Sequence, residues 1–226
     1  MFWWNGKGSD EMNLIVSKTP TIAKGKKSIE KITIPGRSGF LTIDNGTYEG
    51  FVISIECHFD KGTADQDAIL AWLDGGGKLS LDNIRQWDAV ITNSISLEKV
   101  LGLYRSILIQ FECQPVSREI AEKTYTVSSN PATLSITGAT SEMEPIMEIT
   151  AVGDVQVTVN NKAFHLYGLA GKVTLDSKLK VITDHTGANI SHKMLGEFPA
   201  LKPGDNVIDT IGTITGFKMY YHKAFL

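Results

Sequence analysis

Residues 51–59, FVISIECHF, alternate apolar and polar side chains over a length typical of one β-strand. The apolar residues fall at every second position, as expected when one face of a sheet is buried: Phe51, Ile53, Ile55, Cys57 and Phe59. Residues 106–116, SILIQFECQPV, repeat this pattern with Ile107, Ile109, Phe111 and Cys113. The two stretches predict two long strands that share one core.

One stretch between these strands is typical of a short helix. Thr63 is the predicted N-cap, and Gln66 follows three residues later as in a capping box. Ile69, Trp72 and Leu73 recur at helical spacing, and glycines 75–77 then favour a stop. We expect Trp72 to anchor this helix to the sheet.

Residues 78–106, between the helix and the second strand, contain strand-like runs separated by turn residues. A β-meander or an extended hairpin fits this pattern. Trp87 lies in the first of these runs, and the sequence leaves open whether it belongs to the core or to a partner surface.

The β pattern stops at residues 114–116, which predicts a domain boundary near Val116. Residues 117–145 are rich in Ser, Thr, Asn and Pro and contain few apolar runs. The predicted domains are therefore residues 1–116 and residues 117–226.

Short alternating segments with turn residues between them fill the chain from Glu144 onward. The predicted strands comprise residues 146–152 ending at Gly153, then residues 155–159, and a hairpin turn at Asn160–Asn161. Later apolar positions continue the count to about seven strands: Phe164 and Leu166, Val173 and Leu175, Val181, Val207, and Phe217, Met219 and Tyr221. This pattern is typical of a β-sandwich.

Composition and charge exclude several classes of protein. The 226 residues are 42% hydrophobic and 21% charged, with a net charge of -3 spread evenly along the chain. A nucleic-acid binder usually carries a basic stripe, and none is present. No secretory signal or membrane helix is predicted, so we expect folding in a cytoplasm. Cys57 and Cys113 are interpreted as buried, reduced thiols.

No catalytic, cofactor or metal site is predicted. The motifs G-x-S-x-G, H-E-x-x-H and D-x-D-x-D-G are absent. Gly75–Lys78 departs from a phosphate-binding loop, because Trp72 and Leu79 stand where Gly and a hydroxyl are required. Asp184, His185 and His192 are interpreted as solvated loop residues without a third metal ligand.

Several motifs in order resemble the distal tail protein (Dit) family of siphophages. They are the aromatic opening WNGKGSDEMNLIV, IPGRSG at residues 34–39 with a turn centred on Tyr48, and the closing Phe111, Cys113 and Pro115. In the second half they are PIMEITAV, LDS at residues 175–177 and GEFPALKPGDNVI. Together they cover nearly the whole chain.

The resemblance implies a mainly β fold: an N-terminal tail-tube-like domain with one short helix, and a C-terminal galectin-like β-sandwich. It further implies a non-enzymatic virion protein, assembled in the host cytoplasm, whose hexameric ring joins the tail tube to tip and baseplate proteins. The implied partners are further copies of the chain, the tail-tube, tape-measure and tail-associated tip proteins, a receptor-binding protein, and DNA passing through the lumen. Ring contacts are expected at Arg37, Trp87, Leu97 and Leu103.

Two other functions remain open at this point. A galectin-like sandwich could act as a carbohydrate-binding module on the host surface, although all four tryptophans precede residue 88. A minor tube or head-completion protein could share the same architecture. A near-neutral to acidic first half also fits a channel that lets DNA slide, because a basic wall would retain phosphates.

Overall fold

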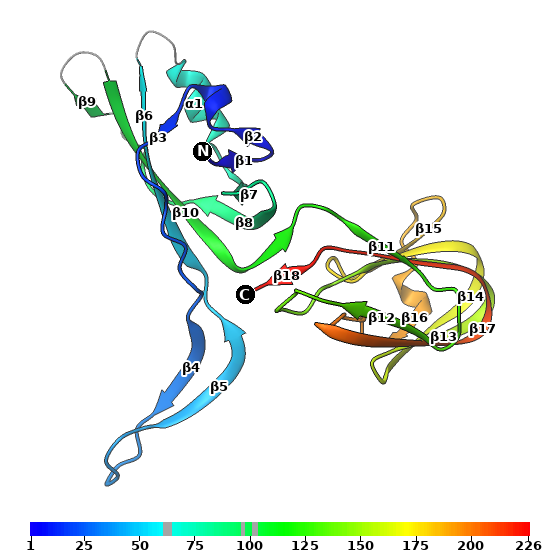
Figure 1. The fold of residues 1–226 in the computed structure, drawn as a ribbon. Helices are drawn as coiled ribbons and strands as arrows, with labels where there is room; N and C mark the ends of the chain where they lie inside the picture. The colour runs from blue at the N-terminus through cyan, green and yellow to red at the C-terminus, as the bar shows by residue number, and fades with distance from the viewer. Residues whose placement is uncertain (61–64, 96–97, 101–103) are drawn as a thin grey trace. The chain divides into compact units, whose positions relative to one another are not determined.

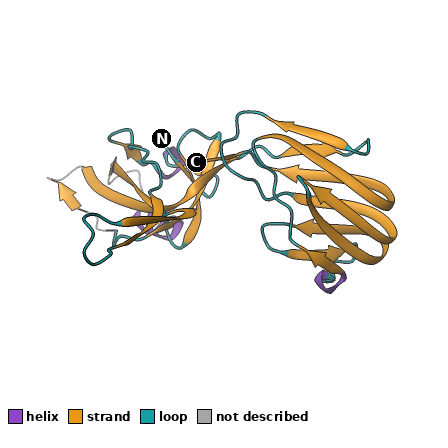
Figure 2. Ribbon diagram, turned by 90° about the horizontal axis from the view of Figure 1, so that it is seen from below, coloured by secondary structure: helices purple, strands orange, loops and turns teal. Residues whose placement is uncertain are grey.

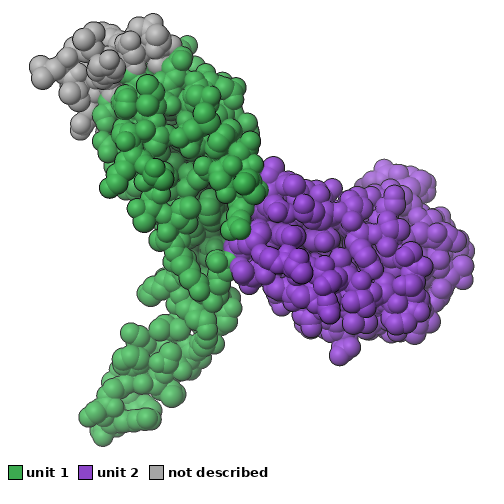
Figure 3. Space-filling view, viewed as in Figure 1, with its two compact units in different colours: residues 1–117, 226 green, residues 118–225 purple. Residues whose placement is uncertain are grey.

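The computed structural model describes residues 1–60, 65–95, 98–100 and 104–226, and its regular structure is mainly β, as predicted (Figure 2). The chain divides into two compact units (Figure 3). The first comprises residues 1–117 with Leu226, and the second comprises residues 118–225.

The first unit is built on one antiparallel sheet with strand order β2-β1-β7-β8-β10-β6-β3, and β9 also pairs with β10 (Figure 1). The strands are β1 (Trp3–Trp4), β2 (Lys7–Gly8), β3 (Ile15–Val16), β6 (Phe51–Asp60), β7 (Gly76–Ser80), β8 (Arg85–Ile91), β9 (Glu98–Val100) and β10 (Tyr104–Glu119). A 3-10 turn, η1 (Asp10–Met12), follows β2. A separate hairpin, β4–β5, is described below.

Strands β6 and β10 form the centre of the core, which confirms the prediction from their alternation. Ile55 is paired with Ile109, and Ile53 with Phe111. All four of these side chains are fully buried, whereas Glu56 on the other face is exposed. Period-two alternation therefore separates a core face from a solvent face along both strands.

The predicted helix is α1 (Gln66–Trp72), but its N-cap is Asp65. The Asp65 carboxylate accepts hydrogen bonds from the backbone N–H groups of Asp67 and Ala68, at 3.1 and 3.3 Å. A carboxylate at this position also interacts favourably with the helix dipole. The predicted cap, Thr63, lies outside the described residues.

Trp72 ties α1 to the N-terminal strands, as expected. Its indole Nε1 donates to the carbonyl oxygen of Trp4 at 3.2 Å. Its ring stacks on Phe2 with centroids 5.6 Å apart, and Phe2 in turn packs edge-on against Phe111 at 5.7 Å. Helix α1 and the aromatic N-terminal segment thus cover the apolar face of the β6–β10 pair.

The second unit is a seven-stranded antiparallel sheet in which three strands are unusually long. The long strands are β13 (Ile146–Val159), β14 (Lys162–Asp176) and β17 (Gly204–Tyr221). The shorter elements are β11 (Lys123–Thr126), β12 (Ala132–Ile136), β15 (Val181–Asp184), η2 (Ser191–Lys193) and β16 (Met194–Gly196), and β18 (Ala224–Phe225) follows β17. The long strands curve strongly, so that the sheet bends over its own core (Figure 1).

Three predicted strand breaks in this unit are wrong. The break expected at Gly153 is a β-bulge, where the pairing of β13 with β14 shifts register between Gly153 and Val155. Gly153 has φ +81, so it bends the strand without ending the ladder. Likewise, the separate strands predicted at 164–166 and at 173–175 are both parts of β14. Those predicted at Val207 and at 217–221 are both parts of β17.

The hairpin predicted at Asn160–Asn161 is confirmed. Both residues have positive φ, at 52° and 66°, as a two-residue turn between twisted strands requires. Across the turn Val157 is paired with Phe164, and both side chains are buried. The turn therefore fixes the register that places the apolar residues of β13 and β14 in one core.

Candidate assembly surface

A two-stranded hairpin stands apart from the main sheet of the first unit (Figure 1). It consists of β4 (Lys27–Ile32) and β5 (Leu41–Tyr48), joined by residues 33–40. We call residues 24–49 the arm. It projects from the body of the first unit in the space-filling view (Figure 3).

The arm exposes large apolar side chains that no other element of the described first unit covers (Figure 3). Their exposed fractions range from 38% to 55%, and they are Ile29, Ile32, Ile34, Phe40, Leu41 and Ile43. A two-stranded hairpin alone in water is marginally stable at best. Clustered exposed apolar residues are typical of surfaces that become buried on binding. The arm is therefore the strongest candidate contact surface in the first unit.

The root of the arm is held closely against β10. The backbone N–H of Glu49 donates to the carbonyl of Lys26 at 2.7 Å, which closes the hairpin. A Cβ added at Gly50 would lie 2.8 Å from the Cys113 carbonyl oxygen, and one added at Gly25 would lie 3.0 Å from Cβ of Pro115. Only glycine permits the backbone at these two positions to lie so close to β10. The root of the arm is therefore packed against the main sheet.

Charged side chains of the arm interact mainly within the arm. Lys27 forms an ion pair with Asp44. A side-chain hydrogen bond from Lys27 and a backbone hydrogen bond from Gly46 lower the pKa of the Asp44 carboxyl. The Nζ atom of Lys31 lies 4.5 Å from the ring centroid of Phe40, a cation–π contact.

The structure places the predicted contact residues in different settings. Arg37 is exposed in the turn of the arm, where its backbone N–H donates to the Ile34 carbonyl at 3.1 Å. Trp87 is in β8, only 8% exposed, and packs edge-on against Phe51 with centroids 6.4 Å apart. Leu97 and Leu103 lie outside the described residues. Arg37 therefore lies in the turn of the separate hairpin, whereas Trp87 lies in the main sheet.

Sequence reasoning missed the arm as an element, although it singled out Arg37 at its turn. The signal was present in KSIEKITI and FLTI, two β-like runs on either side of PGRSG. Such a pattern is typical of a hairpin with a long turn. The pattern does not indicate that the hairpin forms a sheet separate from the main sheet.

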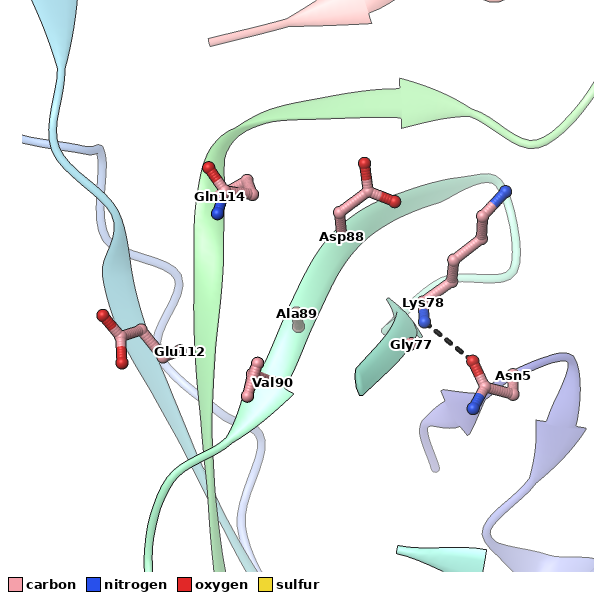
Figure 4. Close-up of a pocket in the computed structure, with 8 residues that line it drawn as sticks. All are labelled: Asn5, Gly77, Lys78, Asp88, Ala89, Val90, Glu112 and Gln114. Carbon is pink, nitrogen blue, oxygen red and sulfur yellow. Dashed lines mark hydrogen bonds between the residues drawn. The ribbon is translucent and has the colours of Figure 1, made fainter. Parts of the chain in front are cut away.

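The solvent face of the main sheet carries a second, polar surface with a hollow of about 460 Å³ (Figure 4). Glu112 and Gln114 of β10 and Asp88 of β8 line it. Lys78 is paired with Asp88 on the neighbouring strand, and its backbone N–H donates to Oδ1 of Asn5 at 2.8 Å. The hollow thus has carboxylates, an ammonium group and amides, without an arrangement of nucleophile and base.

The cysteines are packed as apolar residues, as interpreted from the sequence. Both are unbonded and at most 1% exposed, and burial raises the pKa of each thiol to about 12. Thiols protonated at neutral pH are poor nucleophiles and metal ligands.

The described part of the chain contains neither a metal-binding group of side chains nor a membrane-spanning helix. There, no group of three His, Cys, Asp or Glu side chains could hold a metal ion. Within the same residues, no helix is both long enough and apolar enough to span a bilayer.

Asp184 accepts hydrogen bonds from the Thr186 side chain and from the Thr186 and Ala188 amides. These bonds stabilise the loop that follows Asp184.

Comparison with known proteins identifies the fold. No family model matches the sequence, and no curated protein matches it. Among solved structures, the chain is similar to the Dit protein of SPP1, described as a paradigm of the hub adsorption apparatus in Gram-positive infecting phages. The TM-score is 0.78 at 12% identity, over 100% of this chain and 98% of that one. The fold is therefore Dit-like, which confirms the resemblance found in the sequence.

Proposed function

We propose that this protein is a structural hub of a phage tail, whose copies close into a homohexameric ring at the distal end of the tail. The observation that carries the proposal is the likeness of the fold to SPP1 Dit over the whole of this chain. In this role the protein acts through protein contacts, without a reaction or a cofactor.

The exposed arm favours a protein that assembles into an oligomer over one that remains a monomer. A closed ring requires each subunit to offer two different complementary surfaces. The arm supplies one such surface, because its apolar residues are exposed and its root is fixed. In the proposed ring it reaches a neighbouring copy, with Arg37 at its tip. The ring then joins the tail-tube and tape-measure proteins to the tip and receptor-binding proteins.

The solvent face of the main sheet fits the wall of a channel. Ser54 is paired with Gln110 on this face, and Glu56 and Glu112 are exposed nearby. Lys78 at the hollow is basic, whereas the other side chains named on this face are uncharged or acidic and offer phosphates little to bind. We therefore propose that this face lines the lumen through which DNA passes.

Native mass spectrometry of the full chain, with negative-stain microscopy, tests the ring. The expected result is a sixfold oligomer and annular particles at micromolar concentration. A chain that stays monomeric at the highest attainable concentration would contradict the proposal, whereas rings with another number of subunits would contradict only the hexamer.

A saccharide-binding role for the second unit is the second candidate, and one observation favours it. Tyr167 is 42% exposed and its ring stacks on His165, with centroids 6.1 Å apart. Exposed aromatic rings are suited to the apolar faces of sugars. In contrast, Phe164 and Phe217 are buried in the core. Calorimetric titration with host wall polysaccharide, wild type against Tyr167→Ala, distinguishes this role from a scaffold.

A further inference from the structure

We infer that the arm docks through only one of its two faces, and that the surface it meets is the first unit of a second copy of this chain. The docking face comprises Ile32, Leu41 and Ile43 with Glu30, and we call it the apolar face. This inference rests on the proposed ring and adds which side of the arm forms the contact.

The strand register separates the two faces. Directly opposed residues of an antiparallel pair share a face. Ile32 is paired with Leu41, and Glu30 with Ile43, which places all four on the apolar face. The hydrogen bond from Asn45 Nδ2 to Ser28 Oγ, at 3.3 Å, belongs to the same side. Three adjacent aliphatic side chains, each at least 38% exposed, thus form one patch.

The opposite face is already occupied by contacts within the arm. There Ile29 is paired with Asp44, and Lys31 with Thr42. Asp44 is held by Lys27, and Lys31 lies over the ring of Phe40. Docking through this side would disrupt or desolvate these charges, which is costly. The apolar face carries one charged side chain, Glu30, so docking through it removes mainly aliphatic surface from water, which is favourable.

Charge favours a second copy as the partner. The arm carries five Lys or Arg residues and three Asp or Glu residues, a net charge of +2. The remainder of residues 1–117 carries seven basic and eleven acidic residues, a net charge of -4. The arm of one copy and the body of another first unit therefore attract each other. At the root of the arm, Gly25 and Gly50 pack closely against Pro115 and Cys113 of β10.

A matched pair of isoleucines tests the choice of face. Ile32 and Ile29 are both 38% exposed and both lie in β4, on opposite faces. Ile32→Ser is expected to weaken subunit association by about tenfold or more, whereas Ile29→Ser changes it by less than about twofold. Sedimentation velocity over a concentration series measures both, and circular dichroism melting checks that each variant is folded.

Each outcome of this comparison has a distinct meaning. Equal weakening by the two variants, or weakening by Ile29→Ser alone, overturns the choice of face and leaves the ring intact as a proposal. A wild-type chain that never leaves the monomer overturns the proposed function itself.

Cross-linking tests the identity of the receiving surface. Ile43→Cys introduces an exposed thiol on the apolar face, while the native cysteines are buried. A photoreactive maleimide reagent attached there, in a mixture of isotope-labelled and unlabelled chains, marks contacts between copies. Cross-links to residues 1–117 of another copy are expected. Cross-links between copies that map only to residues 118–225 would overturn the inferred partner surface.

Discussion

The β6–β10 pair and the arm are both antiparallel pairs that carry large aliphatic residues, yet the exposures of these residues are opposite. Ile55 and Ile109 are fully buried, while Ile32 and Ile43 are 38% and 41% exposed. The difference lies in what covers each pair. Helix α1 and the aromatic N-terminal segment cover β6 and β10, whereas no layer among the described residues of the first unit covers the arm. Alternation therefore specifies a strand and its two faces, whereas burial depends on a second layer, which a partner can supply.

The largest expected effect comes from removing the uncovered pair. Deletion of residues 27–48 leaves ends that already meet, because the Glu49 N–H bonds to the Lys26 carbonyl. We expect subunit association to fall by about a hundredfold or more, since one of the two complementary surfaces of the proposed ring is lost. Native mass spectrometry measures the loss.

The same deletion is expected to leave the folded chain almost as stable as before, because none of the buried core residues belongs to the arm. A melting temperature within about 2 °C of the wild type is the expected result. A large drop in melting temperature would mean that the arm supports its own unit, and the contrast with β6–β10 would fail.

A pair of phenylalanine substitutions compares covered and uncovered positions directly. Phe111 is fully buried between Phe2 and Trp4, and Phe111→Ala is expected to destabilise the first unit by about 3–5 kcal/mol. Phe40 in the arm is 55% exposed, so Phe40→Ala is expected to cost less than about 0.5 kcal/mol.

Urea denaturation followed by tryptophan fluorescence isolates the first unit in this comparison, because all four tryptophans precede residue 88. Similar losses of unfolding free energy in Phe111→Ala and Phe40→Ala would indicate that the arm packs against the core of its own unit in solution.

The sequence was sufficient to predict elements that have a local signature, and strands that pair with a strand of the same alternating pattern. The β6 and β10 faces, the short helix and the Asn160–Asn161 turn were predicted because alternation, helical spacing and positive φ each have a local signature. The long strands of the second unit were predicted in pieces. A glycine bulge such as Gly153 resembles a turn in sequence, although its strand continues.

The candidate site was only partly predictable, for a physical reason. Arg37 was identified through a family motif, but Ile32 and Ile43 have the sequence signature of core residues. Their exposure follows from the absence of a covering layer, which is a property of the tertiary structure. Trp87 shows the converse: an aromatic residue left open between core and surface is 8% exposed and packs against Phe51.

A smaller effect is expected at the helix that covers β6 and β10. Asp65→Ala removes the acceptor for the Asp67 and Ala68 amides and is expected to destabilise the first unit by about 1 kcal/mol. Asp74→Ala, beyond the end of α1, is the matched control and should be nearly neutral. Fluorescence-detected urea unfolding again measures both. If Asp65→Ala and Asp74→Ala change the unfolding free energy equally, the Asp65 cap does not stabilise the helix that covers β6 and β10.

The smallest effect concerns the ion pair on the occupied face of the arm. Hydrogen bonds from Lys27 and Gly46 lower the pKa of Asp44, so its stabilising contribution is present above the ordinary carboxyl pKa and is lost as pH falls through the lowered value. The pair is exposed, so we expect no measurable change in melting temperature between pH 5 and 8.

Nuclear magnetic resonance titration of the Asp44 carboxyl measures this pair without relying on stability. In Lys27→Met, the Asp44 titration midpoint should move upward, because both the hydrogen bond and the positive charge are removed. Raising the salt concentration in the wild type should move it in the same direction. An unchanged midpoint would mean that Lys27 does not hold Asp44 in solution, and the face bearing Ile29 would then be as available for docking as the apolar face.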